Sequence, residues 1–285
     1  MKNNKQMKTG IIGLGLIGGS MALALKKATG TEIYGRDLHH YRQALELGLV
    51  SDELTDDRIP EMDIIIIATP VDTLAEIACD ILDKIHSEAL VFDVGSTKNR
   101  LAQAIAQHPK RENFVLAHPI AGTEYSGPEA AFSSLFTGKM NIVCDVAHAK
   151  AEILQKALQI FDALQMKTIE MDSAEHDRHI AYVSHLSHVS SFMLGKTVLD
   201  LEKDEKNIFR MAGSGFASTV RLAKSSPDTW TPIFLENKKP LLQALDEYID
   251  NLNDFKVMLY RENHQKIKET LKRINYIGKI IDSIQ

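Results

Sequence analysis

Short continuous runs of apolar residues recur through the first half of the chain, and stretches of helical spacing separate them. Such runs are typical of strands that helices cover on both faces of a sheet. Alternating strands and helices predict an α/β fold with a doubly wound, mostly parallel sheet. The strand-like runs are residues 11–12, 32–35, 63–68, 90–94, 114–117, 141–144 and 167–171.

The pattern changes after the last of these runs, because helical spacing then continues to the end of the chain. Residues 173–201 are apolar or small on nearly all sides, which predicts a helix buried on most of its faces. Apolar residues then repeat every three to four positions from Leu241 to Ile281. We therefore predict two domains, 1–172 and 173–285, and a homodimer formed through the helical domain. A self-contained helical bundle that caps the sheet is the alternative.

Three spaced glycines follow the first strand and lead into a helix. Gly13 allows a tight turn, Gly15 lets a pyrophosphate approach the backbone, and Gly18 lets the helix pack on the strand. Free N–H groups and the helix dipole would hold the phosphates. We expect Leu16 and Ile17 to belong to the same dinucleotide site. The alternative is a glycine-rich turn in an ordinary α/β domain.

The identity of the dinucleotide depends on Asp37, which follows the second strand. A carboxylate there accepts hydrogen bonds from the ribose hydroxyls and repels a 2′-phosphate, so NAD is favoured over NADP. Arg36 is the complication, because its guanidinium could pair with a phosphate. NAD is the cofactor if Arg36 points to solvent. Thr69, which follows the 63–68 strand, completes the expected cofactor-binding set.

The composition is that of an ordinary globular protein of 285 residues, with 44% hydrophobic and 25% charged residues. The formal net charge is −5 and there is no basic run, so neither nucleic acid nor a membrane surface is an expected partner. Cys79 and Cys144 are far apart in apolar surroundings, which indicates a reducing compartment. The first residues are polar, unlike a signal peptide, and no segment is long enough to span a bilayer. We expect a cytoplasmic protein.

His118 is the candidate general base, because it comes directly after the 114–117 strand. Ligands of an open α/β sheet bind outside the carboxyl ends of the strands. A histidine at that place can take a proton from an alcohol while a hydride leaves its carbon. Arg221 lies near a glycine- and serine-rich segment, where it could clamp a carboxylate or remain a solvated helix arginine.

The helical half carries further histidines at positions 176, 185 and 188. His185 and His188 are three residues apart and could share a metal ion. No third ligand has a clear spacing, so no metal site is predicted.

Successive segments of the chain resemble the prephenate dehydrogenase family, in order and over nearly the whole length. The block at 118–124, His-Pro-Ile-Ala-Gly-Thr-Glu, is more distinctive than the glycine pattern. The matching segments are 13–20 with Asp37, 93–98, 118–124, 183–188 and 215–237. The resemblance implies a Rossmann domain followed by an all-α dimerisation domain. It also implies the NAD-dependent oxidative decarboxylation of prephenate to 4-hydroxyphenylpyruvate and carbon dioxide, a step of tyrosine biosynthesis.

The resemblance also implies roles for individual residues. His118 would accept the proton of the ring hydroxyl, and Ser96 would orient both that hydroxyl and His118. Arg221 would bind a substrate carboxylate, and Glu124 would pair with Arg221 at the entrance. His188 would shape the substrate pocket.

Three further residues of this chain match family positions. Thr123, next to Glu124 in the sequence, is expected to contact substrate. His176 and Trp230 match the family without an assigned role.

One departure from the family pattern leaves the substrate open. Many relatives carry a basic–acidic pair where this chain has Ala217-Ser218, so arogenate could replace prephenate. A β-hydroxyacid dehydrogenase is a rival with a similar layout, but such enzymes use a lysine on the first long helix of the second domain, where this chain offers His185 and His188. A non-catalytic NAD-binding sensor is the rival of a different class, and it would have lost the base at His118.

Overall fold

The structure is a computed structural model that describes residues 6–123, 125–202 and 207–284. The chain divides into two compact units, Met1–Lys238 and Lys239–Gln285. The domain boundary between 172 and 173 falls inside the larger unit, where the sheet gives way to helices, and it stays a prediction.

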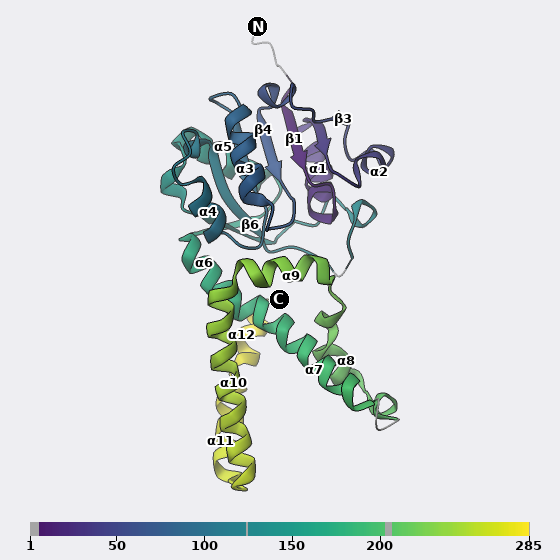
Figure 1. The fold of residues 1–285 in the computed structure, drawn as a ribbon, viewed down its shortest axis with the longest axis vertical. Helices are drawn as coiled ribbons and strands as arrows, with labels where there is room; N and C mark the ends of the chain where they lie inside the picture. The colour runs from purple at the N-terminus through teal and green to yellow at the C-terminus, as the bar shows by residue number, and fades with distance from the viewer. Residues whose placement is uncertain (1–5, 124, 203–206, 285) are drawn as a thin grey trace. The chain divides into compact units, whose positions relative to one another are not determined.

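The larger unit is built on one sheet of eight strands in the order β3-β2-β1-β4-β5-β6-β7-β8 (Figure 1). All neighbouring strands are parallel except β6 and β7. The predicted doubly wound, mostly parallel sheet is therefore confirmed. The strands are β1 (Lys8–Ile12), β2 (Glu32–Arg36), β3 (Asp52–Glu53), β4 (Ile64–Ile67), β5 (Leu90–Asp93), β6 (Phe114–Pro119), β7 (Met140–Cys144) and β8 (Lys167–Met171).

Strand β3 is the one strand of this sheet that was not predicted from the sequence. Its two exposed acidic residues give no apolar run, and it pairs only with Tyr34 and Gly35 of β2.

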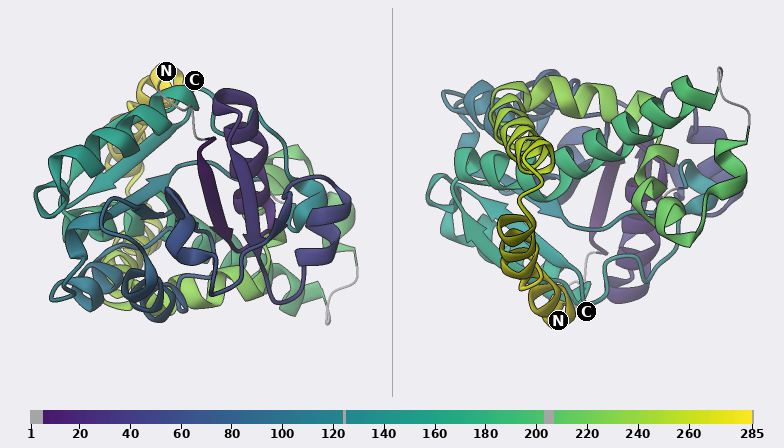
Figure 2. Two further views of the ribbon diagram at one scale, coloured as in Figure 1. Left: turned by 90° about the horizontal axis from the view of Figure 1, so that it is seen from above. Right: turned by 90° about the horizontal axis from the view of Figure 1, so that it is seen from below.

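Helices cover both faces of the sheet (Figures 1 and 2). Helices α1 (Leu16–Thr29) and α5 (Ala151–Ala163) pack on one face, and α3 (Leu74–Lys84) and α4 (Asn99–Ile105) pack on the other. The central strands are buried on both sides, which explains why they are apolar without alternation. The remaining elements of this half are α2 (Tyr41–Glu46) and 3₁₀ turns at Ile59–Glu61, Arg111–Asn113, Pro128–Ala130 and Val146–His148.

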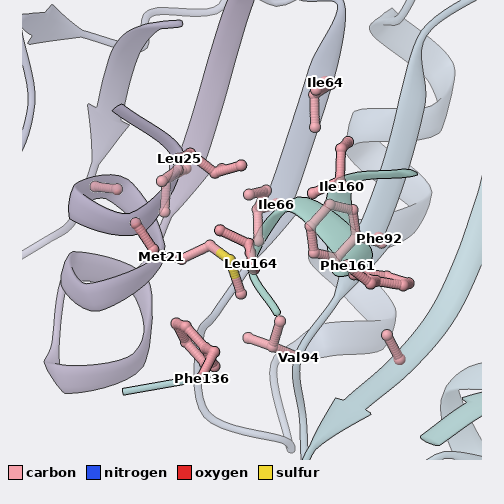
Figure 3. Packing of buried hydrophobic residues seen from close by; sticks show 14 of the residues in the cluster. Met21, Leu25, Ile64, Ile66, Phe92, Val94, Phe136, Ile160, Phe161 and Leu164 are labelled. Atoms are coloured by element: carbon pink, nitrogen blue, oxygen red, sulfur yellow. The ribbon is translucent and has the colours of Figure 1, made fainter. Parts of the chain in front are cut away.

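The core between α1, α5 and the sheet is closely packed (Figure 3). The rings of Phe92 on β5 and Phe161 on α5 meet edge to face, with centroids 5.3 Å apart. Met21 and Leu25 of α1 and Ile66 of β4 fill the neighbouring space. This core fixes the strands whose carboxyl ends carry the candidate site.

A continuous helical path follows the sheet. It consists of α6 (Ser173–Ile180), a π-helical turn (Ala181–His185) and α7 (Leu186–Glu202). The helix expected over 173–201 is therefore present, but the prediction that it is buried on most sides is wrong. Met193 is 52% and Leu199 56% exposed, and only His188 and Ser191 of α7 are buried. Apolar composition predicts that a helix face will be covered, but not whether its own chain covers it.

The larger unit then continues through short helices. They are a 3₁₀ turn (Ile208–Met211), α8 (Ser214–Thr219), a 3₁₀ turn (Arg221–Lys224) and α9 (Pro227–Glu236). Helix α9 lies at the edge of the sheet where the parallel strands end (Figure 1).

The smaller unit is entirely helical in its described part. Helix α10 (Lys238–Tyr260) leads into it, and α11 (His264–Ile274) and α12 (Ile277–Ile284) complete it. The repeated apolar residues predicted from 241 onward lie on these helices. None of the helices in the described ranges is both long and apolar enough to cross a membrane.

Candidate active site

The glycine-rich turn between β1 and α1 is shaped by Gly13 and Gly18. Gly13 has φ +91°, and a Cβ there would lie 2.4 Å from the carbonyl oxygen of Ala68 and 2.9 Å from the backbone nitrogen of Thr69. A Cβ on Gly18 would lie 1.8 Å from the carbonyl oxygen of Gly13. Both positions therefore require glycine for the fold itself. The backbone of Thr69 therefore lies directly beside the turn, and its role in cofactor binding stays a prediction.

Gly15 has a different surrounding. A Cβ on Gly15 would meet no atom of the described residues within 4 Å. Packing within the chain therefore does not explain this glycine, whereas the close approach of a pyrophosphate does. The residues of this turn fit a dinucleotide.

The amino-terminal end of α1 is prepared for an anion. Gly15 is the N-cap residue and provides no side-chain hydrogen bond, and the first turn holds no acidic residue. Leu16 is buried and Ile17 packs against the core, so their side chains stabilise the helix while their backbone N–H groups remain for phosphate oxygens.

Asp37 holds the same turn from the end of β2. Its Oδ2 accepts a hydrogen bond from the N–H of Leu14 at 2.7 Å, and its Oδ1 accepts from the N–H groups of His39 and His40 at 2.8 Å. Burial acts to raise the pKa of Asp37, but these backbone donors outweigh it and the pKa lies below its ordinary value. The carboxylate stays ionised and keeps lone pairs for ribose hydroxyls.

Arg36 is engaged elsewhere. Its Nε donates to the carbonyl oxygen of Leu54 at 2.8 Å, and its guanidinium pairs with Asp56 at 2.6 Å. Asp56 also pairs with Lys84. Arg36 therefore does not simply point to solvent, which was the condition expected for NAD; an ion pair with Asp56 occupies its guanidinium instead.

His118 is the last but one residue of β6 and is buried. Its Nδ1 lies 2.8 Å from Nε2 of His176, and Nδ1 of His176 lies 2.8 Å from Oδ1 of Asp177. A carboxylate only accepts, so His176 donates from Nδ1 and, with one proton on its ring, accepts at Nε2. His118 therefore donates from Nδ1, and its own Nε2 carries the free lone pair. This is the tautomer that a general base requires.

The surroundings of His118 keep it neutral. Burial lowers the pKa of His118 well below 6.5, and the nearby His176, Lys98 and His185 act in the same direction. A neutral imidazole is able to accept a proton at neutral pH.

The His118 end of β6 is tied to the start of α4 by buried charges. Asp177 accepts hydrogen bonds from the N–H groups of Lys98 at 2.8 Å and Asn99 at 2.9 Å. The Lys98 ammonium, wholly buried, bonds to Asp93 and to the carbonyl oxygen of Ala117. Burial raises the pKa of Asp93, and the Lys98 charge opposes that change.

Asp93 and Lys98 belong to the 93–98 segment that resembles the family, and no role was predicted for either residue from the sequence. The available signal was a carboxylate inside an otherwise apolar strand, which must find a buried partner.

The helical half brings an aromatic cluster to the site. His188 stacks on Trp230 with centroids 3.3 Å apart and an interplanar angle of 22°. Burial is the main reason that the pKa of His188 lies below its ordinary value, and the charge of Arg221 contributes in the same direction. Arg221 is exposed, and it lies close enough to His188 for its charge to affect the pKa of that ring. The structure therefore brings His188, Trp230 and Arg221 into one neighbourhood.

The remaining predicted residues are placed less distinctively. Ser96 is half-buried in the loop between β5 and α4, two residues before the buried Lys98. Thr123 is exposed, and its Oγ1 accepts from the N–H of Tyr125 at 3.2 Å. Glu124 lies outside the described residues. Within the described part of the chain, no three His, Cys, Asp or Glu side chains converge as metal ligands would.

Comparison with known proteins accounts for both halves of the chain. Residues 21–170 match the nucleotide-binding domain of prephenate dehydrogenase, and residues 172–273 match its dimerization domain.

Individual relatives agree with these domain matches. A prephenate dehydrogenase of Bacillus subtilis is 33% identical, over 92% of this chain and 73% of its own length. A cyclohexadienyl dehydrogenase of Zymomonas mobilis is 30% identical, over 92% of each chain.

A solved structure agrees with the fold. The prephenate dehydrogenase of A. aeolicus, in complex with hydroxyphenyl propionate and NAD+, superimposes with a TM-score of 0.90 at 30% identity. The superposition covers 98% of this chain and 100% of that one. Domain order, sequence and fold agree throughout, and the chain belongs to the prephenate dehydrogenase family.

Proposed function

We propose that this chain uses His118 as general base in the NAD-dependent oxidative decarboxylation of prephenate to 4-hydroxyphenylpyruvate and carbon dioxide. The chain is an oxidoreductase of the prephenate dehydrogenase family, and its cofactor is NAD. The observation that carries the role of His118 is its bond to His176, which leaves Nε2 as the free acceptor.

The proposed reaction moves one proton through His118. Nε2 of His118 takes the proton of the ring hydroxyl. At the same time, the C–H bond of the carbon that bears this hydroxyl breaks, and the hydrogen leaves with the electron pair. NAD+, when bound, accepts that pair as a hydride. The bond between the ring and its carboxylate then breaks, carbon dioxide leaves, and the electrons make the ring aromatic. His118 returns its proton to the phenolate oxygen, so the product carries a hydroxyl.

The neighbours of His118 support this step. The bond from Nδ1 of His118 to Nε2 of His176 holds the ring in place for this transfer, and Asp177 holds His176 in turn. General-base help of this kind is worth about 10²–10⁴-fold in rate. Ser96 would orient the ring hydroxyl from the loop that Lys98 anchors.

The substrate carries two carboxylates, and Arg221 would bind one of them as a bidentate partner. His188 and Trp230 would line the pocket through their stacked rings. Thr123 and Glu124 would contact substrate from the loop that follows β6.

Arogenate is the second candidate substrate. The Zymomonas mobilis relative is named a cyclohexadienyl dehydrogenase and matches this chain over 92% of both lengths. The Ala217-Ser218 departure concerns the same question, because it removes a charged pair near Arg221.

The helical part matches a dimerization domain. We infer a homodimer, with 173–285 as the dimerisation domain, because Met193 and Leu199 on α7 leave apolar surface uncovered within one chain. Sedimentation of the purified chain measures this. A cytoplasmic location stays a prediction, supported by the free Cys79 and Cys144.

The experiment that tests the function is NADH formation by the purified chain with prephenate or arogenate and with NAD or NADP. We expect fast reduction with prephenate and NAD. His118→Asn should reduce kcat by about 10²–10⁴-fold and leave NAD affinity unchanged. Binding of NAD without turnover on either substrate would instead support the sensor. Unchanged kinetics in His118→Asn would remove His118 from the mechanism.

A further inference from the structure

His185 is completely buried and has one polar atom without a partner. Its Nε2 finds no hydrogen-bonding atom among the residues that the structure describes. Its other ring nitrogen, Nδ1, lies 3.1 Å from Nδ2 of Asn237. The reaction proposed above gives His185 no task.

The protonation of His185 follows from the orientation of Asn237. Nδ2 of Asn237 lies 2.7 Å from the backbone carbonyl oxygen of Asp177. Only the amide nitrogen can donate to a carbonyl oxygen, so this bond fixes which end of the Asn237 side chain faces His185. The second N–H of Asn237 then donates to Nδ1 of His185. Nδ1 is an acceptor, and the proton of the neutral ring is on Nε2.

His185 is neutral at physiological pH. Burial lowers its pKa to about 4. The unpartnered atom is therefore a neutral N–H donor, and a buried donor without an acceptor costs free energy unless a ligand or water satisfies it.

The backbone at His185 is also unusual. His185 ends the π-helical turn Ala181–His185, in which the N–H of Leu186 bonds to the carbonyl oxygen of Ala181, five residues earlier. Single π-turns are costly and occur frequently at functional sites. The turn stands between α6, which carries His176, and α7, which carries His188.

The surroundings place His185 in the candidate active site. Its ring meets the edge of Trp230 with centroids 6.0 Å apart at 82°, and the same Trp230 stacks on His188. His185 is also near enough to His118 to act on it electrostatically. The ring that carries the unpartnered N–H is therefore near the proposed base and in contact with Trp230, which is expected to line the substrate pocket.

We infer that His185 is a substrate-binding residue whose Nε2–H donates a hydrogen bond to an oxygen atom of the bound substrate, and that Asn237 positions it. This rests on the proposed function. The donor fits a carboxylate or keto oxygen. It does not fit an ammonium group, because both partners would then be donors.

Two substitutions separate the nitrogen atoms of His185. In His185→Asn, the side-chain oxygen takes the place of Nδ1 and can still accept from Asn237, but the Nε2 donor is gone. In His185→Gln, the amide nitrogen takes the place of Nε2 and keeps the donor. We expect His185→Asn to raise the KM for prephenate about tenfold, which is the effect of one hydrogen bond. His185→Gln should recover most of this loss.

Other quantities should stay constant in His185→Asn. We expect kcat to remain within about twofold, because a contact present in both ground and transition states changes KM alone. The affinity for NAD and the melting temperature should match those of the unaltered chain. A product-binding measurement gives the same comparison without turnover: 4-hydroxyphenylpyruvate, titrated into the NAD-loaded protein in a calorimeter, should bind about tenfold more weakly to His185→Asn.

The substrate arms identify the oxygen atom. A loss with prephenate but not with arogenate would assign the contact to the keto oxygen, and an equal loss with both would assign it to a carboxylate. An unchanged KM in His185→Asn would overturn the inference. So would equal losses of NAD affinity and melting temperature in both variants, because these indicate a structural role. Absence of turnover in the unaltered chain would contradict the proposed function instead.

The unaltered protein provides a second measurement that does not depend on the folding of either variant. Nitrogen-15 spectra of labelled histidine should show the His185 proton on Nε2, and this resonance should move when 4-hydroxyphenylpyruvate binds. A proton on Nδ1, or a resonance that does not move, would reject the contact.

Discussion

Nδ1 of His118 and Nε2 of His176 lie 2.8 Å apart, and this bond determines which nitrogen of His118 carries the proton. The carboxylate of Asp177 can only accept a hydrogen bond from His176. It therefore decides which nitrogen donates and which accepts in the two successive bonds. The two histidines come from different halves of the chain, one from the end of β6 and one from α6. The base is therefore assembled only when the helices dock on the sheet.

Replacing His176 should affect the reaction more than the fold of the cofactor site. We expect His176→Leu to lower kcat about 10- to 100-fold, because His118 loses the acceptor that holds its Nδ1 proton; each tenfold corresponds to about 1.4 kcal/mol. His176 also helps to lower the pKa of His118, so the acid limb of kcat/KM should move to higher pH. Steady-state kinetics over a pH series measures both effects.

His176→Gln is the matched control, because the side-chain oxygen of glutamine can still accept from His118. Its kcat should lie between those of His176→Leu and the unaltered chain. If His176 only fills space, the melting temperature and KM will change while the acid limb stays in place.

The stability of the chain should fall as the pH drops below about 6.5. His118, His185 and His188 all have lowered pKa values, mainly because of burial. Below about pH 6.5 the unfolded chain therefore binds more protons than the folded chain does. Their contribution is complete above the ordinary value of 6.5 and is lost as the pH falls towards the folded values. His185, with a pKa of about 4, accounts for roughly 3 kcal/mol of this loss.

Urea unfolding at constant ionic strength between about pH 7.5 and about pH 4.5 checks this dependence. His185→Gln removes one titrating group and should flatten the decline. A free energy of unfolding that stays constant over this range would show that these histidines titrate normally.

Much of the fold could be predicted from the sequence, since buried parallel strands leave continuous apolar runs such as Ile64–Ile67. The two-residue strand Asp52–Glu53 could not, because it has no apolar residue. The exposed Met193 and Leu199 were expected to be buried, because the pattern of a helix does not identify its covering partner.

Site residues next to strand ends were equally visible in the sequence, because topology places them. His118 is the example. The orientation of its ring was not visible, because it depends on Asp177, which is distant in the sequence. The unpartnered N–H of His185 could not be predicted either, because the tautomer of His185 depends on Asn237, which lies far along the sequence at the C-cap of α9.

Two glycines of the same turn should respond differently to alanine. Gly15→Ala should fold normally, because its Cβ meets no atom of the described part of the chain within 4 Å, and it should weaken NAD binding by entering the pyrophosphate space. Gly13→Ala should lower the melting temperature, because φ is +91° and the Cβ would lie 2.4 Å from the Ala68 carbonyl oxygen. Thermal unfolding and NAD titration of both variants make the comparison. Equal loss of stability in the two would show that Gly15 also serves the fold.

The ion pair between Arg36 and Asp56 should protect the preference for NAD. Removing the carboxylate in Asp56→Ala frees the guanidinium, which can then meet the 2′-phosphate of NADP. Asp37 would still repel that phosphate, so the single variant should change the ratio of kcat/KM for NADP over NAD only slightly. The double variant Asp37→Ser with Asp56→Ala should raise the ratio about tenfold or more, since it removes the repulsion and supplies the cation.

Arg36→Ala added to the double variant is the control and should abolish the gain. A gain that survives this third substitution would mean that another group binds the phosphate, and Arg36 would then have no part in cofactor choice.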